Sequence, residues 1–104
     1  MIRNAFTMKL KKGFEAEYKK RHDEIWPELS EELKKAGISD YSIFLDEKTG
    51  VLFAIQKLSD GNGSKELPSK PIMRKWWDYM ADIMDVNPDN SPVCIPLTEV
   101  YHMD

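Results

Sequence analysis

The stretch from residue 14 to residue 33 constrains the fold of this chain most, because its side chains form one stripe at helical spacing. Members of the stripe lie three or four residues apart: Phe14, Tyr18, His22, Ile25, Leu29 and Leu33. All but one are residue types that a helix presents to a core. The exception is His22, a titratable imidazole where an aliphatic side chain is expected.

Pro27 lies inside this helical pattern. It lacks the backbone N–H of a helix interior, and its ring clashes with the preceding turn. We therefore expect a kink or a short break near Trp26, with the helix resuming through Glu28 to Lys35. Gly37 follows Ala36 and suits the end of the helix.

Period-two alternation of apolar residues predicts strands over Ile2 to Leu10, Tyr41 to Leu45 and Val51 to Leu58. The polar turn from Asp46 to Gly50 joins the last two as an antiparallel hairpin. The segment from Ser59 to Lys70 has no clear period and is expected to be a loop, or at most the frayed approach to a helix.

A second helix is expected from Pro71, because a further apolar stripe begins there and proline suits a first helical position. Its members are Ile72, Trp76, Met80 and Ile83. The helix should stop before the polar, proline-containing loop from Asn87 to Pro92. Alternation over Leu97 to His102 predicts a last strand.

The order of these elements is β-α-β-β-α-β. This order predicts an α+β, ferredoxin-like fold, a four-stranded antiparallel sheet with two helices on one face. The length of 104 residues favours a single domain, residues 1–104. The strands are apolar on both sides, as Phe44 beside Ile43 and Phe53 beside Leu52 illustrate, so two sheets packing face to face in a homodimer would cover the second face.

Composition excludes several classes of function. With 15 basic and 18 acidic residues, the net charge of −3 argues against a nucleic-acid surface, and no apolar run has membrane length. Cys94 is the only cysteine, so no intrachain disulfide is possible and a cytoplasmic location is expected. The only histidines, His22 and His102, lack a partner at ligand spacing, so no metal site is expected.

His22 has two interpretations. A lone histidine on an apolar helix face is commonly a hydrogen-bonded structural residue. Imidazole is also the side chain best matched to proton transfer near neutral pH, and Tyr18 lies one turn away. Trp76 has a place in the apolar stripe, whereas Trp77 diverges from it by about 100°, so at least one indole should line a pocket or an interface.

Three parts of the sequence together resemble the L-rhamnose mutarotase family over nearly the whole chain. They are the string from His22 to Leu29 with Tyr18 before it, Tyr41, and the pair Trp76–Trp77 followed by the loop from Asn87 to Pro92. The resemblance implies a dimeric α/β barrel that interconverts the anomers of L-rhamnose without a cofactor. It also implies that His22 is the proton donor and that Tyr18, Tyr41, Trp76 and Trp77 contact the sugar.

The chain departs from the family pattern over Ser59 to Lys70, where the family has a helical lead-in, and at its carboxyl end. Two rival functions use the same architecture: a small cofactor-free monooxygenase and a non-catalytic sugar-binding module. The residues leave open the preferred sugar and the base, which is a carboxylate, a tyrosine-bound water or, in the second half-reaction, His22 itself.

Overall fold

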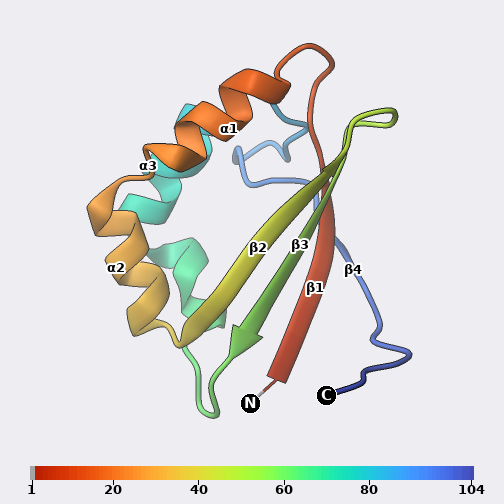
Figure 1. Ribbon diagram of the computed structural model, residues 1–104. Helices are drawn as coiled ribbons and strands as arrows, with labels where there is room; N and C mark the ends of the chain where they lie inside the picture. Colours follow the sequence, from red (N-terminus) through yellow and green to blue (C-terminus); the bar gives the residue numbers. More distant parts are fainter. Residues whose placement is uncertain (1) are drawn as a thin grey trace.

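The computed structural model describes residues 2–104, and its helices all lie against one face of a four-stranded sheet (Figure 1). The elements in chain order are β1 (Ile2–Lys9), α1 (Glu15–Asp23), α2 (Pro27–Lys35), β2 (Ile38–Asp46), β3 (Val51–Leu58), the 3₁₀ helix η1 (Ser64–Ser69), α3 (Pro71–Met80) and β4 (Ile95–Pro96).

The sheet has the strand order β2-β3-β1-β4, and every neighbouring pair is antiparallel. The hairpin β2–β3 turns at Gly50, and β1 pairs along the whole length of β3. This is the ferredoxin-like arrangement that the order of elements predicts. The expected fold class is confirmed.

The first predicted helix is divided at Pro27, as expected. The helix α1 ends at Asp23, and α2 begins with Pro27 at its first position, where a missing N–H costs nothing. Trp26 is extended, with ψ 130°, because a residue before proline is pushed out of the helical region. The break turns α2 relative to α1 (Figure 1).

The core lies between these helices and the inner sheet face. Its largest fully buried side chains come from three different parts of the fold: Leu29 of α2, Leu52 of β3 and Ile83 after α3. Gly37, with φ +87°, ends α2 and turns the chain into β2. A Cβ there would collide with Oγ of Ser59, so the position suits glycine alone.

The second main helix is shorter than predicted. It ends at Met80, whereas the sequence pattern favours continuation to the residues before Asn87. Backbone pairing with the end of β1 replaces helical hydrogen bonds there: the Lys11 N–H donates to the Ile83 carbonyl (2.9 Å), and the Asp85 N–H donates to the Lys9 carbonyl (3.0 Å). Ile83 keeps its place in the core without being helical.

The last strand is misplaced in the prediction from Leu97 to His102. The last strand of the described residues is instead the short β4, just before this range, where Ile95 pairs with Thr7 and Pro96 with Phe6. The Leu97 N–H adds one bond to the Ala5 carbonyl, and the pairing stops. Pro96 has no N–H to extend the ladder, and every side chain from Leu97 onward is exposed.

The loop expected from Ser59 to Lys70 is also partly wrong, because η1 occupies half of it. The Asn62 carboxamide oxygen accepts hydrogen bonds from the Ser64 N–H (3.1 Å) and hydroxyl (2.6 Å) and so starts this turn of 3₁₀ helix. Leu67 of η1 is buried against Ala36 and Ile38. The chain therefore does have a helical lead-in to α3.

Candidate active site

The five residues that the sequence singled out come together. Tyr18 and His22 of α1, Tyr41 of β2, and Trp76 and Trp77 of α3 line one cavity of about 380 Å³ between the helices and the inner sheet face. A cavity of this size suits a small organic molecule. An adjoining, larger cavity lies along α1 and shares four of these residues, but Trp77 does not reach it.

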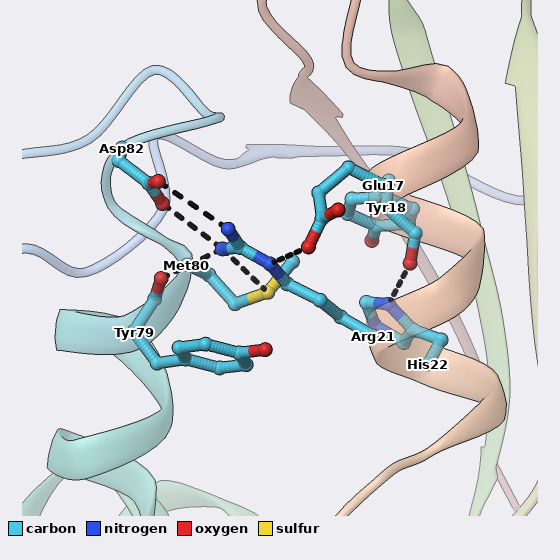
Figure 2. A network of polar contacts seen from close by, with 7 residues as sticks. All are labelled: Glu17, Tyr18, Arg21, His22, Tyr79, Met80 and Asp82. Carbon is cyan, nitrogen blue, oxygen red and sulfur yellow. Dashed lines mark hydrogen bonds and ion pairs between the residues drawn. The ribbon is translucent and has the colours of Figure 1, made fainter.

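His22 is held in one orientation by its own helix. Its Nδ1 lies 3.0 Å from the carbonyl oxygen of Tyr18 (Figure 2), so Nδ1 carries the proton and donates. The Tyr18 ring stacks on the imidazole at a centroid distance of 4.3 Å, and Trp76 meets it edge-on at 5.4 Å. In the neutral ring, Nε2 is therefore left with a free lone pair.

The surroundings of His22 favour the neutral ring. Burial lowers its pKa below the ordinary value of 6.5, and this outweighs the opposing effects of the Tyr18 carbonyl and the negative charge of Asp23. At neutral pH the imidazole is thus mainly a base at Nε2. It becomes an acid only after taking up a proton.

The two tyrosines remain protonated phenols at neutral pH. Burial raises the pKa of Tyr18, which is 8% exposed. Tyr41 has 38% of its surface exposed, yet it stands in a crowded cavity wall, and burial raises its pKa to about 12. Both hydroxyls can therefore donate and accept hydrogen bonds inside the cavity.

A β-bulge aims Tyr41 into the cavity. In the pairing of β2 with β3, Ser39 faces Lys57 and Ser42 faces Ile55, so two residues, Asp40 and Tyr41, lie opposite one. Asp40 has a left-handed φ of 47°. Bulges of this kind re-aim side chains beside functional sites.

The two tryptophans reach the cavity from different surroundings. Trp76 is only 6% exposed and belongs to an aromatic cluster with Trp26 and Tyr79, with centroid distances of 5.1 Å and 5.7 Å. Trp77 is half-buried, and the guanidinium of Arg74 lies 5.6 Å from the centre of its ring. Trp76 thus serves the core and the cavity at once, whereas Trp77 forms part of the cavity wall.

Arg21 belongs to the supporting structure that sequence reasoning missed. Its side chain is only 10% exposed, and it donates to Glu17 (2.7 Å), to Asp82 (2.9 Å) and to the Tyr79 carbonyl (2.8 Å), as Figure 2 shows. Its guanidinium also lies 4.4 Å from the centre of the Tyr79 ring. This clamp ties α1 to the end of α3, one residue away from His22.

Two cavity residues were also missed as site candidates, although their pattern was visible. Asn4 and Gln56 occupy inner positions of β1 and β3, where period two calls for apolar side chains, and both line the cavity. Cys94 lines it as well, whereas His102 lies in the exposed tail and bonds Asp104 (2.8 Å). A polar residue in an otherwise apolar strand row was the available sign.

Within residues 2–104, no group of three or more His, Cys, Asp or Glu side chains is placed to hold a metal ion. None of the helices in this part of the chain is long and apolar enough to cross a membrane.

Comparison with known proteins shows the family to which the chain belongs. The family described as L-rhamnose mutarotase matches residues 3–103. Proteins named L-rhamnose mutarotase from Flavobacterium johnsoniae and Bacteroides thetaiotaomicron are 64% and 62% identical, over 99% and 100% of this chain and 96% and 100% of their own lengths. The crystal structure of L-rhamnose mutarotase from Formosa agariphila superposes with a TM-score of 0.93 at 58% identity, covering all of both chains. The chain belongs to the L-rhamnose mutarotase family.

Proposed function

We propose that this chain is an L-rhamnose mutarotase, an isomerase that interconverts the α and β anomers of L-rhamnose. The observation that carries the proposal is the His22 imidazole, whose Nδ1 is held by a backbone carbonyl while Nε2 is left free in a cavity walled by tyrosines and tryptophans. Exchange of anomers requires opening and closing of the sugar ring, and each step is a proton transfer that an imidazole can perform.

The ring-opening step uses the neutral His22. Its Nε2 takes the proton of the anomeric hydroxyl, O1 forms the carbonyl bond to C1, and the C1–O5 bond breaks with its electron pair going to O5. The imidazolium then gives the proton to O5. Both oxygens are bonded to C1, so one imidazole can reach both, and His22 is the proton donor although it rests as the neutral ring.

Ring closure repeats these transfers in reverse after the aldehyde has rotated about the C1–C2 bond. Attack of O5 on the other face of the carbonyl produces the other anomer. His22 returns to its neutral state, so no proton is gained or lost over the cycle. Of the three bases that the sequence left open, the lowered pKa of His22 favours His22 itself.

The other predicted residues have binding roles in this proposal. Tyr18 and Tyr41 keep their hydroxyl protons and donate hydrogen bonds to sugar oxygens, which stabilises negative charge as the C1–O5 bond breaks. Trp76 and Trp77 offer indole surfaces to the apolar side of the sugar and to the methyl group of a 6-deoxy sugar.

The protein is proposed to work as a homodimer through the outer sheet face. One cross-strand row on that face runs Phe44, Phe53, Thr7 and Ile95, as the pairing registers align them. Phe44 and Ile95 are each 61% exposed, and Ile55 beside the row is 43% exposed. No described helix covers this side of the sheet (Figure 1), and an apolar patch of this kind is typical of a contact between proteins.

Residues 1–104 are proposed to form a single mutarotase domain in each subunit. The protein is proposed to act in the cytoplasm, where the single Cys94 would stay reduced. No cofactor enters the proposed reaction, because it consists of proton transfers between oxygen and nitrogen and of the breaking and re-forming of the C1–O5 bond, with no net oxidation or reduction.

The test is saturation-transfer NMR on L-rhamnose at anomeric equilibrium. Saturating the anomeric proton of one form should lower the signal of the other in the presence of the protein, in proportion to its concentration. The same measurement without protein gives the spontaneous rate. If the protein leaves that rate unchanged, the proposed activity is wrong, and a saturable binding signal without exchange would identify a sugar-binding module instead.

A further inference from the structure

Two amide side chains face each other on the inner side of the sheet, among residues that are otherwise apolar. Asn4 of β1 lies directly opposite Gln56 of β3 in the strand pairing. Their neighbours along the same inner rows are Phe6 and Ala54, which also pair. Gln56 is only 5% exposed and is the buried polar side chain of the described residues. A sheet face that serves only as part of the hydrophobic core would carry apolar side chains at both positions.

The two amides satisfy only part of each other's hydrogen-bonding capacity. The Asn4 Nδ2 donates to the Gln56 Oε1 at 3.0 Å, and this is the single hydrogen bond of either side chain within residues 2–104. The Gln56 NH₂ group and the Asn4 carbonyl oxygen therefore keep a free donor and a free acceptor. Exchanging O and N in both amides leaves the same set, so the conclusion does not depend on their orientation.

Both free groups belong to the cavity that contains His22. The bulge in β2 places Tyr41 opposite Gln56, since Ser39 and Ser42 face the residues on either side of it. A polar row of Tyr41, Gln56 and Asn4 thus crosses three strands on the sheet wall of the cavity. Tyr41 is already a predicted sugar contact, so the two amides extend the polar part of the site.

No fully buried side-chain nitrogen or oxygen of residues 2–104 lacks a hydrogen-bond partner, so the unused donor and acceptor are open to the cavity, where a ligand or water can use them. A donor and an acceptor side by side match a hydroxyl group, or two neighbouring hydroxyls, of a sugar. We propose that Asn4 and Gln56 form a subsite that binds ring hydroxyls of the substrate and selects sugars that carry them. This inference rests on the proposed function, since the reaction at C1 leaves the hydroxyls at C2, C3 and C4 to be recognised.

The test compares L-rhamnose with its 2-, 3- and 4-deoxy derivatives in the wild-type protein and in Gln56→Met, which keeps the side-chain shape without the amide. In the wild type, one deoxy sugar should have a KM about tenfold above that of L-rhamnose, with kcat changed less than about twofold. In Gln56→Met the KM for L-rhamnose should rise by a similar factor. L-rhamnose and that deoxy sugar should then have about equal KM values in this variant. A wild type that does not distinguish the deoxy sugars overturns the proposal.

Further variants separate binding from folding. Asn4→Leu combined with Gln56→Met removes both amides, so no orphaned group remains, and it should unfold at or above the wild-type temperature while keeping the raised KM. A lower unfolding temperature with an unchanged KM would make the pair structural and overturn the inference. Lys57→Leu, the next residue on β3 and directed to the opposite face, should leave KM unchanged.

The proposed function is checked separately in the same data. A wild-type protein that does not accelerate anomer exchange of L-rhamnose contradicts the activity itself. A wild type that accelerates exchange but shows no dependence on the two amides contradicts only the subsite.

Discussion

Arg21 and Asp82 join the helix that carries His22 to the segment after α3 through two hydrogen bonds, Nη1 to Oδ1 at 2.9 Å and Nη2 to Oδ2 at 3.3 Å. The pair holds the pKa of the Asp82 carboxyl below its usual range and raises the pKa of Arg21. Asp82 is 65% exposed, and the hydrogen bond from Arg21 is the largest cause of its lowered pKa. The arginine also donates to the last turn of α3, at the Tyr79 carbonyl (Figure 2).

Replacing Arg21 should therefore affect both stability and catalysis. Arg21→Met keeps the buried stem but removes every donor, and it should lower the free energy of unfolding by about 1–3 kcal/mol. Arg21→Lys retains the charge without the planar fork and should recover only part of that loss. Thermal unfolding measures the first effect. A lower kcat with an unchanged KM would show that the clamp positions His22, whereas equal kcat per folded molecule would limit it to stability.

Asp82 supplies the matched variant. Asp82→Asn should cost less than Arg21→Met, because its carboxylate is exposed and Arg21 keeps two other acceptors, Glu17 and the Tyr79 carbonyl. The pKa of Asp82 is lowered in the folded protein, so its contribution is present above the unfolded-state pKa and is lost as pH falls through the folded-state value. The stability difference between wild type and Asp82→Asn should shrink in acid. A difference that stays constant down to about pH 2 would contradict this assignment.

His22→Gln keeps a polar side chain of similar reach and removes proton exchange near neutral pH. The variant should fold and bind L-rhamnose but lose at least about 10²-fold in the rate of anomer exchange, the usual cost of removing a general acid or base. Saturation-transfer NMR gives the rate, and line broadening of the sugar signals reports binding. A folded variant with a near-normal rate would show that His22 has only a structural role.

The pH dependence follows from the direction of the His22 shift. Burial lowers its pKa below 6.5, so the neutral form, which starts the cycle, increases as pH rises through that lower value. The protein-catalysed rate should therefore rise with pH and level off by about pH 7. A rate that falls over this range would indicate a protonated resting state. The ring-proton signal of His22, distinguished from that of His102 by a His102→Gln variant, should titrate below 6.5.

The outer sheet face predicts the state of assembly. Wild-type protein should sediment at about 24 kDa, twice the 12.1 kDa of one chain. Phe44→Glu places a charge at one end of the row that continues through Phe53 to Ile95, and it should give a folded monomer. Glu66→Lys, on the 3₁₀ helix of the other face, provides a charge-changing control that should remain dimeric. Wild-type protein that sediments as a monomer would remove the dimer from the proposal.

The sequence predicted most of the fold because most of it depends on local patterns. Period two located β1, β2 and β3, and Pro27 located the break between α1 and α2. The predictions fail where hydrogen bonds between residues distant in sequence determine the structure. The end of β1 pairs with the backbone after Met80, and Pro96 limits β4 to a short pairing. No local pattern contains those partners.

The site residues divide in the same way, into those that the sequence predicted and those that depend on distant partners. Helical spacing brought Tyr18 and His22 together, and the resemblance to a family added Tyr41, Trp76 and Trp77. The Arg21 clamp was missed because Glu17, Arg21 and Asp82 look like ordinary surface charges in sequence. The bulge at Asp40 was missed because a register shift depends on the partner strand.

The two cavity tryptophans should respond differently to substitution. Trp76 is buried in the aromatic cluster, so Trp76→Phe should lower stability by about 1–3 kcal/mol as a cavity opens. Trp77 is half-buried, so Trp77→Phe should unfold nearly as the wild type does and yet raise the KM for L-rhamnose. Thermal unfolding and saturation-transfer NMR on each variant measure the two effects. Equal stability losses with equal KM values would contradict the division of roles.

Tryptophan fluorescence tests whether Trp76 and Trp77 contact the sugar. The third tryptophan, Trp26, lines neither cavity and serves as the internal control. Titrating L-rhamnose should change the tryptophan emission of the wild type, because the sugar displaces water from the indole surfaces of Trp76 and Trp77. In the double variant Trp76→Phe, Trp77→Phe, the remaining emission comes from Trp26 alone and reports folding but not sugar. If that variant still gives the full response, Trp26 is the reporter and the pair does not lie against the sugar.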